Sequence, residues 1–413
     1  MTPTYWHSLV RRLGFQKTKR PFCLVLRRKK YSSQTLWEIV SFVRRCQGWP
    51  QASVGPGDTL RGDCFWTMPN EFLVRVMGIV QKMSDSSKFW ADLRRFNSRP
   101  VVQDYLLSDI YAAAVRDGID VAYERLRRLI VLGEAPENPA ERVLCNLVQF
   151  LRILGDGSLQ FEKETPLSAL IDAEVIPALL QGVDELPGAS RACSEPTRDV
   201  VPSIASRAKV RRVLLETLDR AQLWGNFAFL NQIMVSEIFF ERVPFARCNA
   251  LIEIAMRHCG YQRLGMTALA WAPLSKIRLD WEAGTLPADE MVAPHGNALI
   301  TTPFGTDATL VLYQYIEFFE CWLTRVEEDL ACEEGRDGAH RAAIDADLRL
   351  NLRQRELLKE LVQNPSNMVD VRGYELRFEV AMSTANTDLA KLAALGWLTA
   401  AYEGKRQVYR LLA

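Results

Sequence analysis

Residue types that bind metals or take part in catalysis gather in the stretch RVPFARCNAL, Arg242 to Leu251, and just after it. Cys248, His258 and Cys259 offer the thiol and imidazole groups that hold zinc, but their spacing fits no common zinc site. They also fall on an apolar helical stretch, where cysteines most often pack as small buried side chains. We therefore predict no metal site, and the stretch is either a degenerate active site or core that resembles one.

The chain that positions these residues is 413 residues long, 48% hydrophobic and 24% charged, which predicts two or three globular domains. It has no apolar run of the roughly 18 residues that a membrane-spanning helix needs, and its start lacks the apolar stretch of a signal peptide. Its nine cysteines include no CxxC pair, which argues against a zinc knuckle and a disulfide framework. These features predict a cytoplasmic protein without membrane contact.

Charge is unevenly distributed although the net charge is only +1. The first 50 residues carry eleven Lys or Arg and one acid, Glu38, and a Gly/Pro-rich stretch, Ser53–Asp58, follows them. We interpret residues 1–60 as a basic N-terminal arm. Two explanations stay open: an arm that contacts nucleic acid or an acidic partner, and a solvated leader without a partner.

Apolar residues at helical spacing dominate residues 61–345, as in Val143–Leu154 and Leu167–Gly182, and predict a helical domain. Residues 346–413 have another pattern, with helices predicted at 351–363, 371–380 and 383–395 and two strands within 397–412. Ser383 is the expected N-cap of the third helix and Gly396 its stop. Three helices and a hairpin form a winged helix. The predicted fold class is mainly α, a helical core followed by a small α/β winged-helix domain.

The central stretch resembles the motif His-Pro-Phe-x-Asp-Gly-Asn-Gly-Arg of the Fic (Fic/DOC) family, whose members transfer AMP from ATP to a protein hydroxyl. Residues 243–251 share Pro244, Phe245 and Asn249 with that motif. Further stretches resemble the family in the same order along the chain, namely Pro187–Arg191, Phe229–Val243, Tyr315–Val326 and the C-terminal winged helix. The resemblance spans roughly residues 100–413 and implies a Fic-like helical core.

The resemblance also implies that this motif has lost its chemistry. Val243 replaces the histidine that acts as general base, and Arg247 replaces the acid that binds magnesium. Cys248 and Ala250 replace glycines whose backbone forms an anion-binding nest, and Leu251 replaces the arginine that pairs with phosphate. We therefore expect no catalytic residue and no cofactor, as in a pseudoenzyme.

An inhibitory element of the family is also missing from the sequence. Many members carry Ser or Thr, three residues and then Glu, whose carboxylate blocks the phosphate-binding arginine. The nearest match, Ser108 to Ala112, has alanine in place of that glutamate. The absence of this glutamate is consistent with the replacement of the phosphate-binding arginine by Leu251.

The resulting hypothesis is a non-catalytic regulator or adaptor that binds double-stranded DNA or a protein partner. On DNA, the third helix of the winged helix would enter the major groove and the hairpin would contact flanking phosphates. The residues assigned to these contacts are Thr384, Asn386, Thr387 and Lys391 on the helix and Lys405, Arg406 and Arg410 on the hairpin. Nine basic against seven acidic residues in 351–413 is a modest charge for DNA binding, so protein docking stays open.

The alternative is a divergent Fic enzyme that transfers AMP, or another phosphate-containing group, to a protein hydroxyl with ATP and magnesium. It would need a base near the motif, and His258 and His295 are the candidates. A third possibility is that Arg247 and the backbone at Asn249 bind phosphate without transferring it. A single cation without a glycine nest is a weak anchor.

Overall fold

The computed structural model describes residues 70–97, 99–156, 165–187, 228–283, 309–363, 367–403 and 406–412, with short strands and single helical positions elsewhere. The chain divides into two compact units. Unit 1 comprises Met1–Trp90 and Tyr105–Leu323, and unit 2 comprises Ala91–Asp104 and Thr324–Ala413. Most of the basic arm predicted at residues 1–60 lies outside the described residues, as do His295 and Lys405.

The division between the units falls inside α15 (Thr309–Ala346), a continuous helix of 38 residues. Two further divisions fall inside helices, between Trp90 and Ala91 in α5 (Lys88–Arg95) and between Asp104 and Tyr105 in α6 (Pro100–Arg116). Residues 346–413, predicted as the C-terminal domain, lie within unit 2. No described helix has the length and apolar character needed to cross a membrane.

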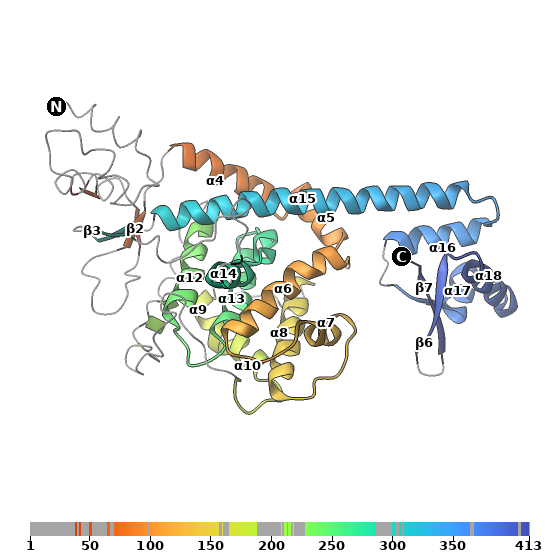
Figure 1. Cartoon of the computed structure of the whole chain (residues 1–413), viewed down its shortest axis with the longest axis horizontal. Coiled ribbons are helices and arrows are strands. Elements are labelled where there is room, and N and C mark those ends of the chain that lie inside the picture. Colours follow the sequence, from red (N-terminus) through yellow and green to blue (C-terminus); the bar gives the residue numbers. More distant parts are fainter. Residues whose placement is uncertain are drawn as a thin grey trace. The chain divides into compact units, whose positions relative to one another are not determined.

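The described part of unit 1 consists mainly of helices (Figure 1). Besides α6 they are α4 (Asn70–Met83), α7 (Tyr123–Val131), α8 (Pro139–Gly155), α9 (Leu167–Leu170), α10 (Ile176–Leu179), α12 (Ala228–Arg242), α13 (Asn249–Arg263) and α14 (Leu274–Ala283). A π-helical turn, Ile171–Val175, joins α9 to α10, and a 3-10 turn, Thr267–Trp271, follows α13.

The core of unit 1 is organised around α13, which is buried at every residue from Asn249 to Tyr261. It contacts α8, α9 and α12, and its apolar side chains share one hydrophobic core with those of α8. Its buried Glu253 and Arg257 form an ion pair with each other, as buried charges require. Gly260 faces Gln232 of α12, whose side chain would have to move to make room for a Cβ there. The stretch that resembles the motif leads directly into this buried helix.

Unit 1 also contains a small sheet that the sequence pattern did not predict. Its strands are β1 (Trp49–Gln51), β2 (Cys64–Trp66), β4 (Gly305–Asp307) and β3 (Ile300–Thr302), in that order. β2 and β4 pair in parallel, and the two outer pairs are antiparallel. Strands of three residues are too short to show the alternation of side chains on which strand prediction depends.

Unit 2 continues from α15 with three more helices and three strands (Figure 1). They are α16 (Leu352–Gln363), β5 (Val369–Asp370), α17 (Val371–Phe378), α18 (Met382–Ala394), β6 (Leu398–Glu403) and β7 (Arg406–Leu411). β7 lies between β5 and β6 and pairs antiparallel with both. The fold class, mainly α with a small α/β C-terminal part, is confirmed. Among the described elements that follow α15, the two-residue β5 was not predicted.

The two ends of α18 differ in how well the sequence predicted them. The N-cap position is Ala381, and Ser383 already lies inside the helix, so the predicted cap at Ser383 is wrong. The predicted stop at Gly396 is present, with a φ of +79°. Its N–H binds the carbonyl of Ala393 while the N–H of Trp397 binds that of Leu392. These are the two hydrogen bonds of a Schellman motif, which needs glycine at this position.

Candidate functional site

The loop Val243–Cys248 connects α12 to α13 and is closed on itself by Asn249. The Asn249 carboxamide accepts a hydrogen bond from the Phe245 N–H at 2.9 Å and donates one to the Phe245 carbonyl at 2.8 Å. Val243 and Cys248 both have left-handed backbones, with φ of +47° and +56°. Side chains with a Cβ lose about 1–2 kcal/mol in that conformation. The loop therefore holds a shape that suits glycine better than its present residues.

The N-terminus of α13 is occupied by a carboxylate from elsewhere in the chain. The Ala250 and Leu251 N–H groups donate to Oδ1 and Oδ2 of Asp117, at 3.1 Å and 3.0 Å. Asp117 follows α6, precedes Gly118 and is completely buried. Free N–H groups and the helix dipole make such an end attractive to anions. Here the anion is supplied by the protein itself.

Two residues of the loop, Arg247 and Cys248, contact the segment before Gly188. The Arg247 guanidinium donates to the Leu186 carbonyl at 2.7 Å and lies 3.2 Å from the Glu185 carboxylate. The Cys248 thiol donates to the Pro187 carbonyl at 3.3 Å. Burial, and then the charge of Asp117, raise the pKa of this thiol well above its usual range. Cys248 therefore stays protonated and is a poor nucleophile.

The histidine predicted as a possible base lies far from the loop in the chain. His258 is ten residues beyond Cys248 on α13 and is buried. Burial, helped by the charge of Arg257, lowers its pKa to about 3. His295 lies outside the described residues. Val243 is itself buried and apolar, so the described part of the loop brings no general base to the position of the motif histidine.

The stretch Ser108–Ala112, compared above with the inhibitory motif, has a structural role. Asp109 is buried, accepts from Arg257 at 2.5 Å and from the Ser275 N–H at 2.7 Å, and so ties α6 to α13 and α14. Ser108 donates to the carbonyl of Tyr105, and Ala112 is in the core. The acid at the N-terminus of α13 is instead Asp117, five residues beyond Ala112. The sequence comparison missed it, and its only local signal was an acid before a glycine at a helix end.

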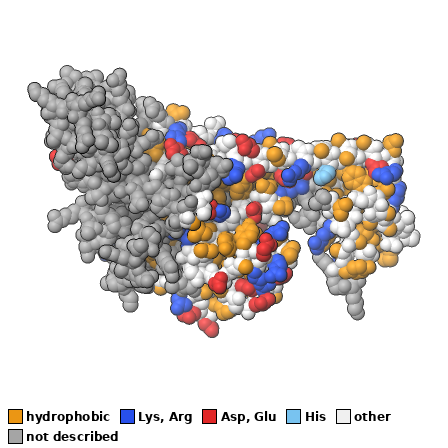
Figure 2. All heavy atoms as spheres, in the orientation of Figure 1, with side chains coloured by type: hydrophobic (Ala, Val, Ile, Leu, Met, Phe, Trp, Pro, Cys, Tyr) orange, Lys and Arg blue, Asp and Glu red, His pale blue; other side chains and the backbone are white. Residues whose placement is uncertain are grey.

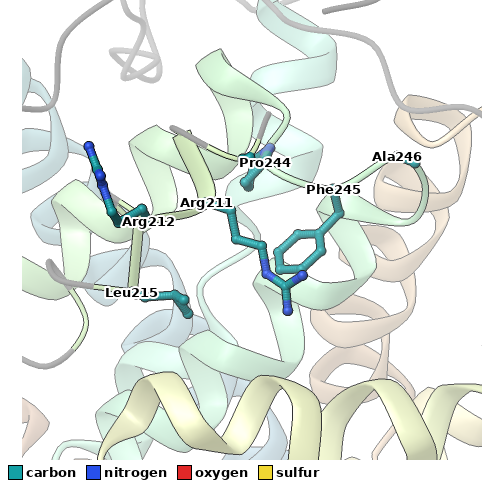
Figure 3. A pocket seen from close by; sticks show the side chains of 7 residues that line it. Arg211, Arg212, Leu215, Pro244, Phe245 and Ala246 are labelled. Carbon is teal, nitrogen blue, oxygen red and sulfur yellow. The ribbon is translucent and has the colours of Figure 1, made fainter. Parts of the chain in front are cut away.

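A pocket of about 420 Å³ opens beside the loop (Figure 3). Its described lining is Ala208, Arg211, Arg212, Leu215, Pro244, Phe245 and Ala246. The Arg211 guanidinium lies over the Phe245 ring, 5.1 Å from its centre, and binds both oxygens of Asp172 at 2.6 Å. Its charge is therefore already paired. The described lining offers an apolar surface with one exposed cation, Arg212, and no acid or base for catalysis.

The predicted DNA-contacting residues of α18 lie mostly on its exposed side. Asn386, Thr387 and Lys391 are exposed and Thr384 is half-buried. Ala385, Leu389 and Leu392 are completely buried, as helical spacing predicted. On the hairpin Arg406 and Arg410 are exposed, and Arg406 forms an ion pair with Asp370.

Asp388, the one acid in the sequence of α18, faces the core. Its carboxylate accepts from four side chains, those of Asn351 (3.0 Å), Gln354 (2.9 Å), Tyr374 (3.0 Å) and Arg353 (3.1 Å). These donors come from α16, from the residue before α16 and from α17. Asp388 therefore joins α18 to α16 and α17. Burial and Asp388 together raise the pKa of Tyr374. The exposed face of α18 therefore carries no acid.

The visible surface of unit 1 shows no extended region of one charge. Basic and acidic side chains lie next to each other over α7 and α8 (Figure 2). Arg125 there pairs with Glu134 at 2.6 Å and with Glu141 at 2.8 Å. A duplex-binding surface needs basic residues that are not already neutralised. On the face in view, α7 and α8 do not provide one.

No protein-family model and no curated protein matches this sequence. Among solved structures, the chain is similar to the crystal structure of a Fic family protein from Desulfovibrio desulfuricans G20. The two are 13% identical, the match covers 82% of this chain and 95% of that one, and the TM-score is 0.40. A similarity of this size assigns neither a family nor an activity.

Proposed function

We propose that this protein is a non-catalytic, Fic-like regulator that binds duplex DNA through unit 2, with α16–α18 and the β6–β7 hairpin acting as a winged helix. The observation that carries the proposal is the acid-free exposed face of α18, created by turning Asp388 into the core. A helix that enters the major groove approaches phosphates from both sides, so an exposed carboxylate there would oppose binding.

The site of Asp117 supports the non-catalytic half of the proposal. A nucleotide phosphate at the start of α13 would need the N–H groups of Ala250 and Leu251, which Asp117 already holds. It would also meet the carboxylate itself, and two like charges at about 4 Å repel by roughly 4 kcal/mol at an effective dielectric constant near 20. Together with the lack of a base at Val243, this argues against AMP transfer, against bound ATP and magnesium, and against retained phosphate binding.

The test is fluorescence anisotropy of the full chain with a labelled duplex of mixed sequence, titrated at several salt concentrations. We expect binding that weakens as salt rises, because phosphate contacts release counterions. Replacing exposed Arg410 with alanine should weaken binding to all duplexes and reduce the salt slope by about one. Arg336→Ala is the matched control, because Arg336 is an exposed arginine of α15 in unit 2.

Two results would overturn the proposal. If no duplex binds even at low salt, unit 2 is better explained as a surface that docks a protein partner. If the protein transfers labelled AMP from ATP to itself or to other proteins, and an Asn249→Ala variant does not, the motif region is catalytic and the alternative of a divergent Fic enzyme replaces the non-catalytic half.

A further inference from the structure

We infer that the exposed face of α18 recognises A·T base pairs in preference to G·C pairs. The inference rests on the proposed function, since it concerns which duplex the same helix binds. It comes from the chemistry of the side chains that α18 exposes. These are Met382, Ser383, Asn386, Thr387, Ala390, Lys391 and Ala394, and all but Lys391 are uncharged.

Asn386 is the main hydrogen-bonding group on this face. It is exposed on the second turn of α18, and within the described part of the chain its carboxamide has no hydrogen-bond partner. A carboxamide presents one donor and one acceptor side by side, which matches N7 and N6 of adenine in the major groove. Asn386 is therefore available to contact adenine as soon as α18 enters the groove.

The neighbours of Asn386 add methyl groups. The Thr387 hydroxyl donates to the Ser383 carbonyl at 2.8 Å, which turns it back onto the helix and leaves the methyl as the part free for contact. Ala390 is exposed one turn further along. Of the four bases only thymine carries a methyl group in the major groove, and small apolar side chains contact it favourably. Adenine and thymine contacts thus lie on one face at helical spacing.

The side chains of α18 that could recognise G·C pairs make contacts within the protein. Guanine is typically read by arginine or lysine, but the Lys391 ammonium of α18 donates to the Arg349 carbonyl at 2.5 Å. Cytosine is read by a carboxylate, and the only acid of α18, Asp388, is buried with four donors around it. The exposed face is therefore equipped for A·T pairs and not for G·C pairs.

The experiment is selection of bound duplexes from a random pool by the full chain, followed by affinity measurements on the recovered sequence. We expect A·T pairs at the recovered positions, with each adenine contacted by Asn386 preferred about 5- to 150-fold over other bases. Replacing adenine by 7-deazaadenine at that position should remove this preference. Replacing thymine by uracil should weaken binding about fourfold for each methyl contact, the equivalent of about 0.8 kcal/mol.

Two variants assign the preference to α18. Asn386→Ala should bind all duplexes but lose the discrimination at one position, and its exposed site leaves the fold intact. Asn367→Ala removes the same side chain from another exposed position of unit 2, before β5, and should retain the full discrimination. Equal affinity for A·T and G·C duplexes overturns this inference and leaves the proposed function standing. Absence of binding to any duplex overturns both.

Discussion

Replacing Asp117 with alanine should destabilise unit 1 strongly. The change removes the acceptor of the Ala250 and Leu251 N–H groups, and all three residues are buried, so water does not replace it readily. Hydrogen bonds to a charged acceptor contribute about 1.5–3 kcal/mol each. Because both bonds share one carboxylate, we expect a loss of about 3–5 kcal/mol in the free energy of unfolding. Asp117→Asn, which keeps the shape and one acceptor, should lose about half of that.

The measurement is urea unfolding followed by circular dichroism, with hydrogen exchange of the peptide that contains residues 249–251 as a local readout. Asp120→Ala is the control, since Asp120 is an exposed acid three residues away, and it should change stability by less than about 0.5 kcal/mol. An anion should partly replace the missing carboxylate. Phosphate at ten times its dissociation constant would return about 1.4 kcal/mol to Asp117→Ala and nothing to the wild type. Equal stability of the Asp117 and Asp120 variants would refute the assignment of Asp117 as the cap of α13.

Three further outcomes are expected. Glu379 ends α17 with a φ of +50°, so Glu379→Gly should raise the free energy of unfolding in urea by about 1 kcal/mol. Glu375→Gly, inside α17, should lower it by a similar amount. Asp388→Ala should cost about 3 kcal/mol because Gln354 and Tyr374 lose a buried partner, while Asp345→Ala, on the exposed surface, should be nearly neutral. His258 has a folded pKa of about 3, below its unfolded value near 6.5, so the unfolded state binds the extra proton and stability falls as the pH drops from 6.5 towards 3. Between pH 7 and 5 the wild type should lose about 2 kcal/mol more than His258→Leu, and parallel pH profiles would contradict this.

Local patterns in the sequence located most of the elements that follow α15. Apolar spacing located α16, α17 and α18, and Gly396 located the end of α18, because both signals act within a few residues of the chain. The start of α18 was misplaced, since its N-cap position holds alanine and leaves no polar cap to recognise. β5 was missed because two residues cannot show a period.

The important contacts of the site are long-range and have no local signature. Asp117 is 133 residues from Ala250 in the chain, and nothing near either residue indicates that they meet. Asp388 presents the opposite problem. It follows Thr387 directly in the sequence, but α16, the residue before it and α17 surround its carboxylate with donors. Whether a polar side chain on the buried side of a helix finds hydrogen-bond donors depends on those partners, which a single segment does not reveal.

The closed loop before α13 is shaped by a few side-chain contacts. Each of the three residues shared with the Fic motif shapes this loop. The Asn249 carboxamide binds both the N–H and the carbonyl of Phe245. The Phe245 ring stacks on the Phe239 ring with the two ring centres 6.1 Å apart, and Pro244 is buried next to Phe245 in the chain. These contacts hold the loop in one shape although Val243 and Cys248 have left-handed backbones and the loop contains no glycine. The same shape brings the first N–H groups of α13 to the carboxylate of Asp117, so the start of the buried helix depends on how the loop is closed.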